Sequence, residues 1–462
     1  MLAVYNVRTT TAFWIHAILR PFCLLSVRRS GYHRKIMRER RAAADSTPWS
    51  RDIGLVLPGG GARCAYQVGV LKAIAEMMPK GSMNPFPVIS GTSAGSINAA
   101  VLATRARRFQ HAVTDMERVW GNFRTHQVFR DDSMTMLKTS LNWLFSIVMG
   151  GRFGSNPKSL LDNAPLRALL GRYLKLSHIE DSIDRGFLDA IAVTAAGYGS
   201  SRSVSFYQGL ESHEPWARVR RTGVPAEITL DHLMASVAAP LVFPPVLLGR
   251  EYYGDGAMRQ ATPLSPAVRL GAKRLLIIGV RNEERDPEPG PDDVVPFPSF
   301  GRIAGYMLDA LLMDGLSADL ERLARLNRIV NEQPGRKMAG DFPALRSIDT
   351  MILMPSQDIR EIALRHLHEM PRPVRFLMRG IGALNYGGRQ LVSYLLFESG
   401  YTRELIRLGY TDAMAREMEV RDFLKGVPLD EPSGIVGWRD LSDEYSMRVP
   451  ILKVDEAQQA TA

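Results

Sequence analysis

NPFPVISGTSAGSINAAVLATRA, residues 84–106, carries the sharpest structural signal in the chain. Its first part is a short apolar run of the kind that forms a buried strand, and its second part has the composition of a helix. The pentapeptide GTSAG lies between them, which puts Ser93 on a sharp turn from strand to helix, where a nucleophilic serine is displayed. Gly91 and Gly95 remove side chains that would clash where the strand and the helix cross closely. The alternative is an ordinary turn in which Ser93 caps the helix.

A second unit of the same kind precedes this one. IGLVLPGGGARCAYQVGVLKAIAEM, residues 53–77, predicts a buried strand, a glycine turn and an amphipathic helix. Further strands are expected at residues 186–196, 202–208, 272–280 and 349–355. Strands that alternate with helices imply a mainly parallel sheet covered by helices on both faces, so we expect an α/β fold.

The chain divides by composition into five parts. We expect a basic, disordered extension over residues 1–50 and an α/β core over residues 51–284. An exposed loop rich in proline and acidic residues follows at 285–300. Helical apolar spacing then predicts a mostly helical part over 301–428 that packs on the core, and residues 429–462 form an irregular tail.

The positive charge of the chain is concentrated at its N-terminus. The 462 residues are 45% hydrophobic and 23% charged, which is typical of a globular protein, and the formal net charge is +10. Residues 1–44 hold nine basic side chains against Glu39 alone, so the rest of the chain carries only about +2. A near-neutral body argues against a nucleic-acid partner. Cys23 and Cys64 lie in unrelated contexts and form neither a disulfide framework nor a metal-ligand set.

Two apolar segments raise the question of membrane contact. TTTAFWIHAILRPFCLLSV, residues 9–27, is interrupted by a histidine, an arginine and a proline, so it lacks the ~20 apolar residues of a spanning helix. It also lacks a clean signal-peptide cleavage site. We expect residues 1–44 to be a poorly ordered tail, or upstream sequence translated from an early start with Met37 opening the true domain, or a basic amphipathic anchor on a membrane surface. The second segment, around Trp143, is either a core helix or a flap that meets lipid. We expect a cytoplasmic protein, peripheral on the membrane if either contact forms.

The glycine turn predicts an anion site. Gly59, Gly60 and Gly61 lie between a strand and a helix, where free N–H groups point outward and the helix dipole favours negative charge. A nucleotide P-loop would continue with Gly-Lys-Ser/Thr, and a dinucleotide fingerprint would place a third glycine at position 64. Here Arg63 and Cys64 follow instead. An oxyanion hole, which stabilises the O⁻ of a tetrahedral intermediate, is the remaining interpretation.

The base that would take the proton of Ser93 is less obvious. The chain has nine histidines, and none lies in a recognisable motif. His366 and His368 fall in a predicted helix, where residues two apart point to different faces. Asp255 stands out instead, because it occupies a glycine-flanked turn after an apolar strand in LGREYYGDGAMRQATPLSPA. By itself this aspartate is more typical of a tight turn that it stabilises by hydrogen bonding.

Together these motifs resemble the patatin-like phospholipase family. The likeness runs almost continuously from about Ile53 to Val280 and is carried by GGGARCAYQVGVLKAI, VISGTSAGSINAAVLA, ASVAAPLVFPPV and YYGDGAMRQATPLSPAVRLGAKRLLIIGV. The resemblance implies a three-layer α/β fold with a C-terminal helical extension. It also implies a lipid acyl hydrolase with Ser93 as the nucleophile and Asp255 as the general base, without histidine, metal or cofactor. Such a carboxylate, ordinarily with a pKa near ~3.9, must be desolvated and must contact the serine at ~2.6 to 3.2 Å.

The resemblance assigns roles to the remaining motif residues. It implies that Gly59–Gly61 form the oxyanion hole and that Arg63 holds this loop in place. Gly256 and Ala257 complete the Asp-Gly-Ala motif, an ordinary variant of Asp-Gly-Gly. The sequence departs from the family at Cys64, where glycine is common; this position should already lie at the start of a helix, so we expect a modest effect.

Other activities are compatible with the same motifs. An acyltransferase, or a hydrolase of lysophospholipids or acyl thioesters, would use the same pair of residues. A catalytically idle lipid-binding protein is an alternative of a different class. In each case the partner is a lipid at a membrane surface, and the sequence indicates neither the head group, the acyl length nor the oligomeric state.

Overall fold

The computed structural model describes residues 48–132, 159–282, 297–311, 315–332, 346–384 and 388–428. Several expectations fall outside these ranges: the basic residues 1–44, the apolar segment around Trp143, most of the 285–300 loop and the 429–462 tail. In the ranges that are described, no helix combines the length and the apolar character needed to cross a bilayer.

In the described part of the chain, ten strands form one mixed sheet. The strands are β1 (Ile53–Leu57), β2 (Val88–Thr92), β3 (Ala190–Gly197), β4 (Ser203–Gly209), β5 (Trp216–Arg218), β6 (Arg221–Pro225), β7 (Val246–Leu248), β8 (Glu251–Asp255), β9 (Arg274–Ile278) and β10 (Asp349–Leu353).

Helices surround the sheet and make up most of the C-terminal region. The α-helices are α3 (Ala65–Met77), α4 (Ala94–Thr104), α5 (Phe109–Trp120), α6 (Thr125–Val128), α8 (Ala164–Tyr173), α9 (His178–Asp184), α10 (Leu230–Ser236), α11 (Ser265–Arg269), α12 (Phe300–Asp309), α13 (Gly315–Glu332), α14 (Ile359–Arg365), α15 (Arg372–Gly380), α16 (Arg389–Leu395), α17 (Ser399–Ala415) and α18 (Glu417–Lys425). Short 3₁₀ turns are η1 (Gly61–Cys64), η2 (Gly256–Met258) and η4 (Leu367–Glu369).

The centre of the sheet is parallel. β10, β9, β1, β2 and β3 lie side by side in this order, and each adjacent pair is parallel. Parallel neighbours need crossover connections, and the helices between the strands supply them. These strands are buried on both faces, which explains why they appear in the sequence as continuous apolar runs such as IGLVL. The expectation of a mainly parallel α/β sheet is confirmed.

The far side of β3 is built differently. β4 and β8 both pair with β3 in antiparallel fashion, and β7 forms a hairpin with β8. The pairing of β3 with β4 confirms that the segments at 186–196 and 202–208 are neighbours. The β5 and β7 strands were not predicted, because three-residue strands that are partly exposed leave no periodic signal.

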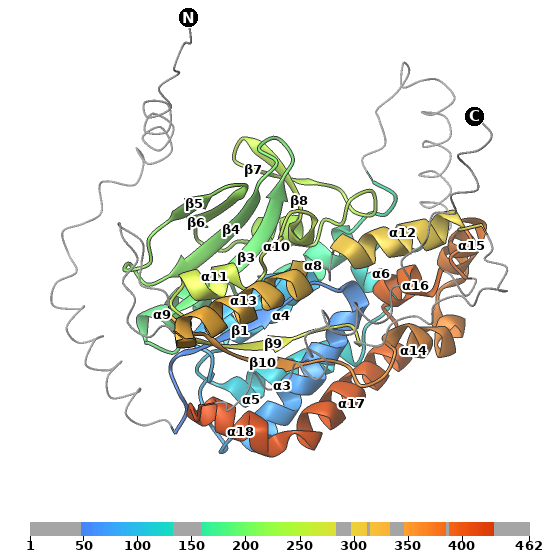
Figure 1. The fold of residues 1–462 in the computed structure, drawn as a ribbon. Helices are drawn as coiled ribbons and strands as arrows, with labels where there is room; N and C mark the ends of the chain where they lie inside the picture. Colours follow the sequence, from blue (N-terminus) through green and yellow to red (C-terminus); the bar gives the residue numbers. More distant parts are fainter. Residues whose placement is uncertain are drawn as a thin grey trace, which may run out of the picture.

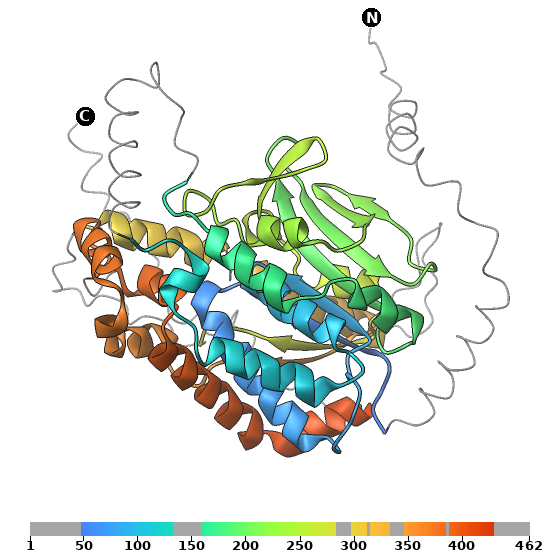
Figure 2. The same cartoon turned by 180° about the vertical axis from the view of Figure 1, so that it is seen from behind.

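Two hydrophobic layers cover the two faces of the sheet (Figures 1 and 2). On one face, side chains such as Leu55 and Leu276 pack in a core shared with α3, α4, α5 and α17. On the other face, Val56 and Ile277 pack against residues of α11 and α13. The alternation of Leu55 and Val56 between the two cores follows from the period of two in a strand. The result is three layers with the sheet in the middle.

The C-terminal helices return to the first helix of the core. α17 lies along α3, and their side chains are joined by hydrogen bonds from Tyr66 Oη to Asp412 Oδ2 (3.0 Å) and from Tyr410 Oη to Glu76 Oε2 (2.7 Å). In Figure 1 the red-orange C-terminal helices lie beside blue α3, although they are more than 300 residues apart in the chain (334 for Tyr410 and Glu76). This packing brings α12 and α16 close to the glycine turn.

Candidate active site

Ser93 sits on a strained turn between β2 and α4. Its backbone φ is 52° and its ψ is −133°, a conformation that L-residues rarely adopt. Side chains at the flanking glycines would collide with backbone: a Cβ on Gly91 would lie 2.5 Å from Ser96 Cα, and one on Gly95 would lie 2.1 Å from Leu57 O. The two glycines therefore allow the close crossing that holds the serine at the tip of the turn.

β3 brings Ser93 and Asp255 together. Thr92, at the end of β2, pairs with Thr194 of β3, and Asp255, at the end of β8, pairs with the next residue, Ala195. Ser93 Oγ consequently lies 2.6 Å from Asp255 Oδ2 and donates a hydrogen bond to it. The contact falls within the distance expected from the sequence, although the two residues are 162 positions apart.

Burial shifts the acidity of Asp255. The side chain is only 4% exposed. Desolvation disfavours the ionised form and raises the pKa of Asp255 to about 6, although hydrogen bonds from the Ser93 hydroxyl and the Ala257 N–H oppose the shift. The Ala257 N–H donates to Asp255 Oδ1 at 3.0 Å, which leaves Oδ2 for the serine. A carboxylate with this pKa is ionised at neutral pH but accepts a proton far more readily than an exposed one.

A further serine supports the turn. Ser236, in α10, accepts a hydrogen bond from the Ser93 N–H (2.9 Å) and donates one to Thr194 O (2.7 Å). It is fully buried and ties the turn to β3. Sequence analysis did not single out Ser236, although it lies in the ASVAAP segment that carries part of the family resemblance.

Only part of the glycine turn faces Ser93. Gly61 lines the same cavity as Ser93 and Asp255, whereas Gly59 and Gly60 are not among its lining residues. A Cβ on Gly60 would lie 2.6 Å from Val280 Cγ2, so this glycine is packed against the end of the sheet. Gly61 has a φ of 54°, and a Cβ there would lie 2.4 Å from Tyr394 O. Glycine is required at position 61 on both counts.

Arg63 connects the glycine turn to the C-terminal region by hydrogen bonds. Its side chain is 1% exposed and donates hydrogen bonds to Ser393 Oγ (2.9 Å), Asp309 Oδ1 (3.1 Å) and Tyr394 Oη (3.1 Å). The guanidinium also stacks over the Tyr394 ring at 3.8 Å. Asp309 is in turn bound by Arg281, at 2.9 Å. The buried charge of Arg63 is thus neutralised by Asp309 of α12, and α16 supplies further hydrogen bonds from far along the chain.

The residue that departs from the family pattern does not face the cavity. Cys64 ends η1 and caps α3, as expected from the sequence. It is fully buried, and its thiol donates to Pro58 O at 3.7 Å. The thiol packs behind Gly60, with its Sγ 3.4 Å from the position that a Cβ would take there. Cys64 therefore fills space beneath the turn.

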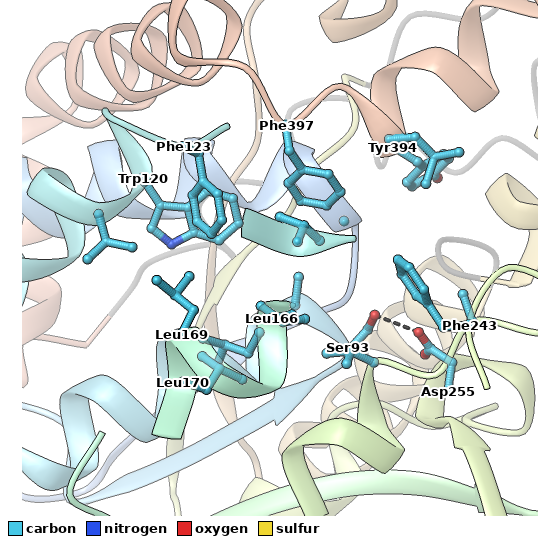
Figure 3. Close-up of a pocket in the computed structure, with 18 of the residues that line it drawn as sticks. Ser93, Trp120, Phe123, Leu166, Leu169, Leu170, Phe243, Asp255, Tyr394 and Phe397 are labelled. Atoms are coloured by element: carbon cyan, nitrogen blue, oxygen red, sulfur yellow. Dashed lines mark hydrogen bonds between the residues drawn. The ribbon is translucent and has the colours of Figure 1, made fainter. Parts of the chain in front are cut away.

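A long apolar cavity of about 360 Å³ opens above Ser93 and Asp255. Figure 3 shows the pair at one end and Trp120, Phe123 and Leu169 toward the other. α4 forms one wall with side chains spaced along a single face, and α5, α8 and the C-terminal region form the others. The α4 residues are Ala94, Ile97 and Val101, and Arg105 follows at the end of the helix. The lining is mostly aliphatic and aromatic, which suits an acyl chain rather than a polar substrate.

No histidine of the described residues lines this cavity. Ser93 and Asp255 make no hydrogen bond to a histidine within the described residues. The prediction that His366 and His368 point to different faces of one helix is wrong, because α14 ends at Arg365 and their rings stack with centroids 6.4 Å apart. Burial alone would lower the pKa of His366, but hydrogen bonds to Glu404 (2.6 Å) and Glu369 (2.7 Å) raise it overall. This cluster is remote from the cavity lining.

Comparisons with known proteins found three similarities. Residues 55–268 match the family model described as patatin-like phospholipase. Lysophospholipase nte1 of Aspergillus terreus is 48% identical over 56 residues, which are 12% of this chain and 3% of that protein. A solved structure, human GIVD cytosolic phospholipase A2 in complex with methyl γ-linolenyl fluorophosphonate, aligns over 85% of this chain and 62% of its own with 12% identity and a TM-score of 0.39. Residues 55–268 therefore resemble a patatin-like phospholipase domain, which makes up a little under half of the chain.

Proposed function

We propose that the protein is a lipid acyl hydrolase that cleaves carboxylic esters with Ser93 as the nucleophile and Asp255 as the general base. The observation that carries the proposal is the 2.6 Å hydrogen bond between the two side chains at the base of an apolar cavity. The family of residues 55–268 supports a reaction on lipid esters. The assignment of Ser93 as the nucleophile and Asp255 as the base rests on the hydrogen bond between their side chains.

Acylation begins when Ser93 Oγ attacks the ester carbonyl carbon. Asp255 Oδ2 takes the hydroxyl proton, and the carbonyl oxygen becomes an oxyanion. The intermediate collapses by breaking the bond to the leaving alcohol, which receives the proton held on Asp255. The products of this half-reaction are the free alcohol and an acyl ester on Ser93.

In deacylation Asp255 is again the general base, but water is the nucleophile and Ser93 is the leaving group. Asp255 takes a proton from a water molecule, whose oxygen attacks the acyl carbonyl. The second tetrahedral intermediate breaks the bond to Ser93 Oγ, and the proton passes from Asp255 to that oxygen. A free fatty acid leaves, and both side chains regain their starting protonation states.

We assign the oxyanion to the N–H groups of Gly61 and Ala94. Both residues line the cavity beside Ser93. Each is the first residue of its helix, η1 and α4, so its N–H has no acceptor within that helix. The positive end of the α4 dipole adds to the stabilisation of negative charge there. The sequence predicted an oxyanion hole at Gly59–Gly61. This assignment retains only Gly61 of these glycines and adds Ala94, the residue that follows Ser93.

The acyl chain would lie along α4. The cavity follows this helix from Ala94 to Arg105, a length of about 17 Å at ~1.5 Å per residue. An extended hydrocarbon advances about 1.25 Å per carbon for bonds of ~1.5 Å at ~111°. The wall therefore accommodates a straight chain of roughly 12 to 14 carbons. At the far end Arg105 and Asp115 form an ion pair (3.2 Å), which closes the apolar channel with charged groups.

The test is hydrolysis of p-nitrophenyl esters by wild type, Ser93→Ala and the matched control Ser265→Ala, which alters a partly exposed serine outside the cavity. Removal of a nucleophile lowers kcat by on the order of 10⁴-fold or more. We expect this loss in Ser93→Ala and wild-type rates in the control. An organophosphonate should also modify wild type at Ser93 only, as identified by mass spectrometry. Equal rates in all three proteins would overturn the proposal.

A further inference from the structure

α12 exposes an apolar face that its own fold leaves uncovered. Phe300 and Tyr306 are 63% and 68% exposed, and Ile303 and Met307 are also exposed. Their spacing of three to four residues puts them on one side of the helix. The opposite side is buried, with Asp309 bound to Arg63. α12 is therefore held firmly while it presents large hydrophobic side chains to the outside.

α15 extends this face. The N-terminus of α12 is joined to the C-terminal end of α15 by hydrogen bonds from Gly301 N to Ile381 O (2.7 Å) and from Ser299 Oγ to Gly382 O (2.9 Å). Figures 1 and 2 show the two helices side by side at one edge of the molecule. Phe376, in α15, is 78% exposed. We call these exposed side chains the α12–α15 surface: Phe300, Ile303, Tyr306, Met307 and Phe376.

The charges around the α12–α15 surface are positive. Arg302 in α12 and Arg372 and Arg379 in α15 are exposed. α15 contains no acidic residue, and the one acid of α12, Asp309, is buried between Arg63 and Arg281. Apolar and aromatic side chains ringed by arginines form the pattern of a helix that lies in the interface of an anionic bilayer.

The segment that carries most of the α12–α15 surface also contributes to the cavity wall. Leu308 and Leu311, at the C-terminal end of α12, line the cavity that holds Ser93 and Asp255. The same short segment thus carries exposed apolar groups at Tyr306 and Met307 and cavity-lining groups one turn away. A lipid that leaves a bilayer in contact with this surface would therefore lie close to cavity-lining side chains of the same segment.

We propose that the α12–α15 surface docks the protein on anionic lipid bilayers and delivers lipid to the cavity. Delivery rests on the proposed function, whereas docking does not require catalysis. Aromatic and aliphatic side chains enter the boundary between head groups and acyl chains, and the three arginines contact anionic head groups.

Docking is tested by flotation of full-length Ser93→Ala protein with vesicles of phosphatidylcholine, alone or mixed with phosphatidylserine. The variant Phe300→Ser/Tyr306→Ser/Phe376→Ser should weaken binding more than about ten-fold, because it removes most of the inserted apolar area. Val219→Ser/Met418→Ser is the matched control, since both residues are exposed but lie on other elements. Circular dichroism verifies that every variant is folded.

The electrostatic contribution is tested separately. Arg302→Gln, Arg372→Gln and Arg379→Gln should each weaken binding to the anionic vesicles about five-fold and leave binding to neutral vesicles unchanged. Arg220→Gln and Arg328→Gln, two exposed arginines on other elements, serve as controls. Residues 1–44 are the same in all variants, so their own basic charge does not affect the comparison.

A local probe identifies the surface that touches lipid. Phe376→Cys in a Cys23→Ser background, labelled with an environment-sensitive fluorophore, should shift to shorter emission wavelength when anionic vesicles are added. Cys64 is fully buried, and burial raises the pKa of its thiol, so it resists labelling. Met418→Cys, on α18, should show no shift. An unshifted Phe376→Cys probe, or full vesicle binding by the triple serine variant, would overturn the proposal. A change in oligomeric state of that variant, with vesicle binding intact, would instead identify the surface as a contact between protein copies.

Discussion

The segment that matches the family model and the region C-terminal to it contribute different things to one site. Residues 55–268 hold Ser93 and Asp255, which meet through adjacent strands of one sheet. The C-terminal region holds Asp309 and Tyr394, which bind Arg63 of the glycine turn. The proposed catalytic pair thus lies entirely in the first segment, whereas both regions support the proposed oxyanion site.

The reason for this division is electrostatic. The chain buries the guanidinium of Arg63, and a buried charge is tolerated only when it is paired and hydrogen-bonded. Within residues 48–132 and 159–282 no carboxylate binds Arg63; Asp309 of α12 provides it. Removal of the C-terminal helices would leave the charge of Arg63 unpaired.

The largest effect is expected from Asp255→Asn, a substitution in the segment 55–268. The amide cannot accept the serine proton, so kcat should fall by on the order of 10³-fold or more. The free energy of unfolding, in contrast, should increase. The folded-state pKa of Asp255 is raised to about 6, so the folded protein keeps a proton that the unfolded chain loses above pH ~4.

The protonation of Asp255 is linked to folding, so the dependence of stability on pH provides a second measurement. The folded state loses stability as pH rises from ~4 to about 6, and the loss persists at higher pH. Asp255→Asn removes this buried charge and should therefore raise the free energy of unfolding by about 1 to 3 kcal/mol at pH 7.5, measured by urea denaturation. A variant that is both active and less stable would contradict the assignment of Asp255.

Asp309→Ala, a substitution in the C-terminal region, should have the next largest effect. It leaves Arg63 with a buried unpaired charge, which typically costs 3 to 5 kcal/mol of stability. Below the unfolding temperature we expect kcat to fall about 10² to 10³-fold with little change in KM, because the loss of one oxyanion donor has this size. Asp319→Ala, at another buried carboxylate that accepts a hydrogen bond from Leu264 N, should lower stability and leave kcat unchanged. Equal kcat values in the two variants would show that the C-terminal region does not act on the site.

Val101→Phe tests the acyl channel within the first segment. A larger side chain midway along α4 shortens the space between Ser93 and Arg105. Hydrolysis of a twelve-carbon p-nitrophenyl ester should fall about ten-fold or more relative to the four-carbon ester, because overpacking of this kind costs about 1 to 3 kcal/mol. Val330→Phe, in α13 and outside the cavity lining, is the control. An unchanged ratio between the two esters would place the acyl chain elsewhere.

The smallest effect is expected from Cys64→Gly, which restores the family pattern. Cys64 packs behind the turn and does not line the cavity. The rate should change by less than about three-fold, and stability should fall by ~1 kcal/mol because glycine loses packing and is less favourable at a helix start. A large gain in kcat would indicate that the thiol impairs the oxyanion site.

The sequence predicted the local parts of this molecule well. β1 with its glycine turn, β2 with Ser93, and the turn at Asp255 each have a short signal, because glycine marks close approaches and apolar runs mark buried strands. The mainly parallel sheet followed from the alternation of strands and helices, and the C-terminal helices followed from helical apolar spacing. The placement of Ser93 beside Asp255 depended on the family resemblance, since nothing local relates the two.

Contacts between distant segments were missed for the same reason. Arg63 and Asp309 are 246 residues apart, and an aspartate at the end of an amphipathic helix gives no sign of its partner. Ser236 likewise lies in a small-residue segment without periodicity. The error at His366 and His368 arose because α14 ends at Arg365, one residue before the pair, and helix ends are poorly defined by apolar spacing.

The most direct measurement of the central claim is the pH dependence of kcat/KM on a short p-nitrophenyl ester. Asp255 acts as a base only when it is ionised, so the account predicts that kcat/KM rises with pH, follows one ionisation near 6 and is level above it. A rate that stays constant as the pH rises through 6, in a protein that remains folded, would contradict the role of Asp255 as the base.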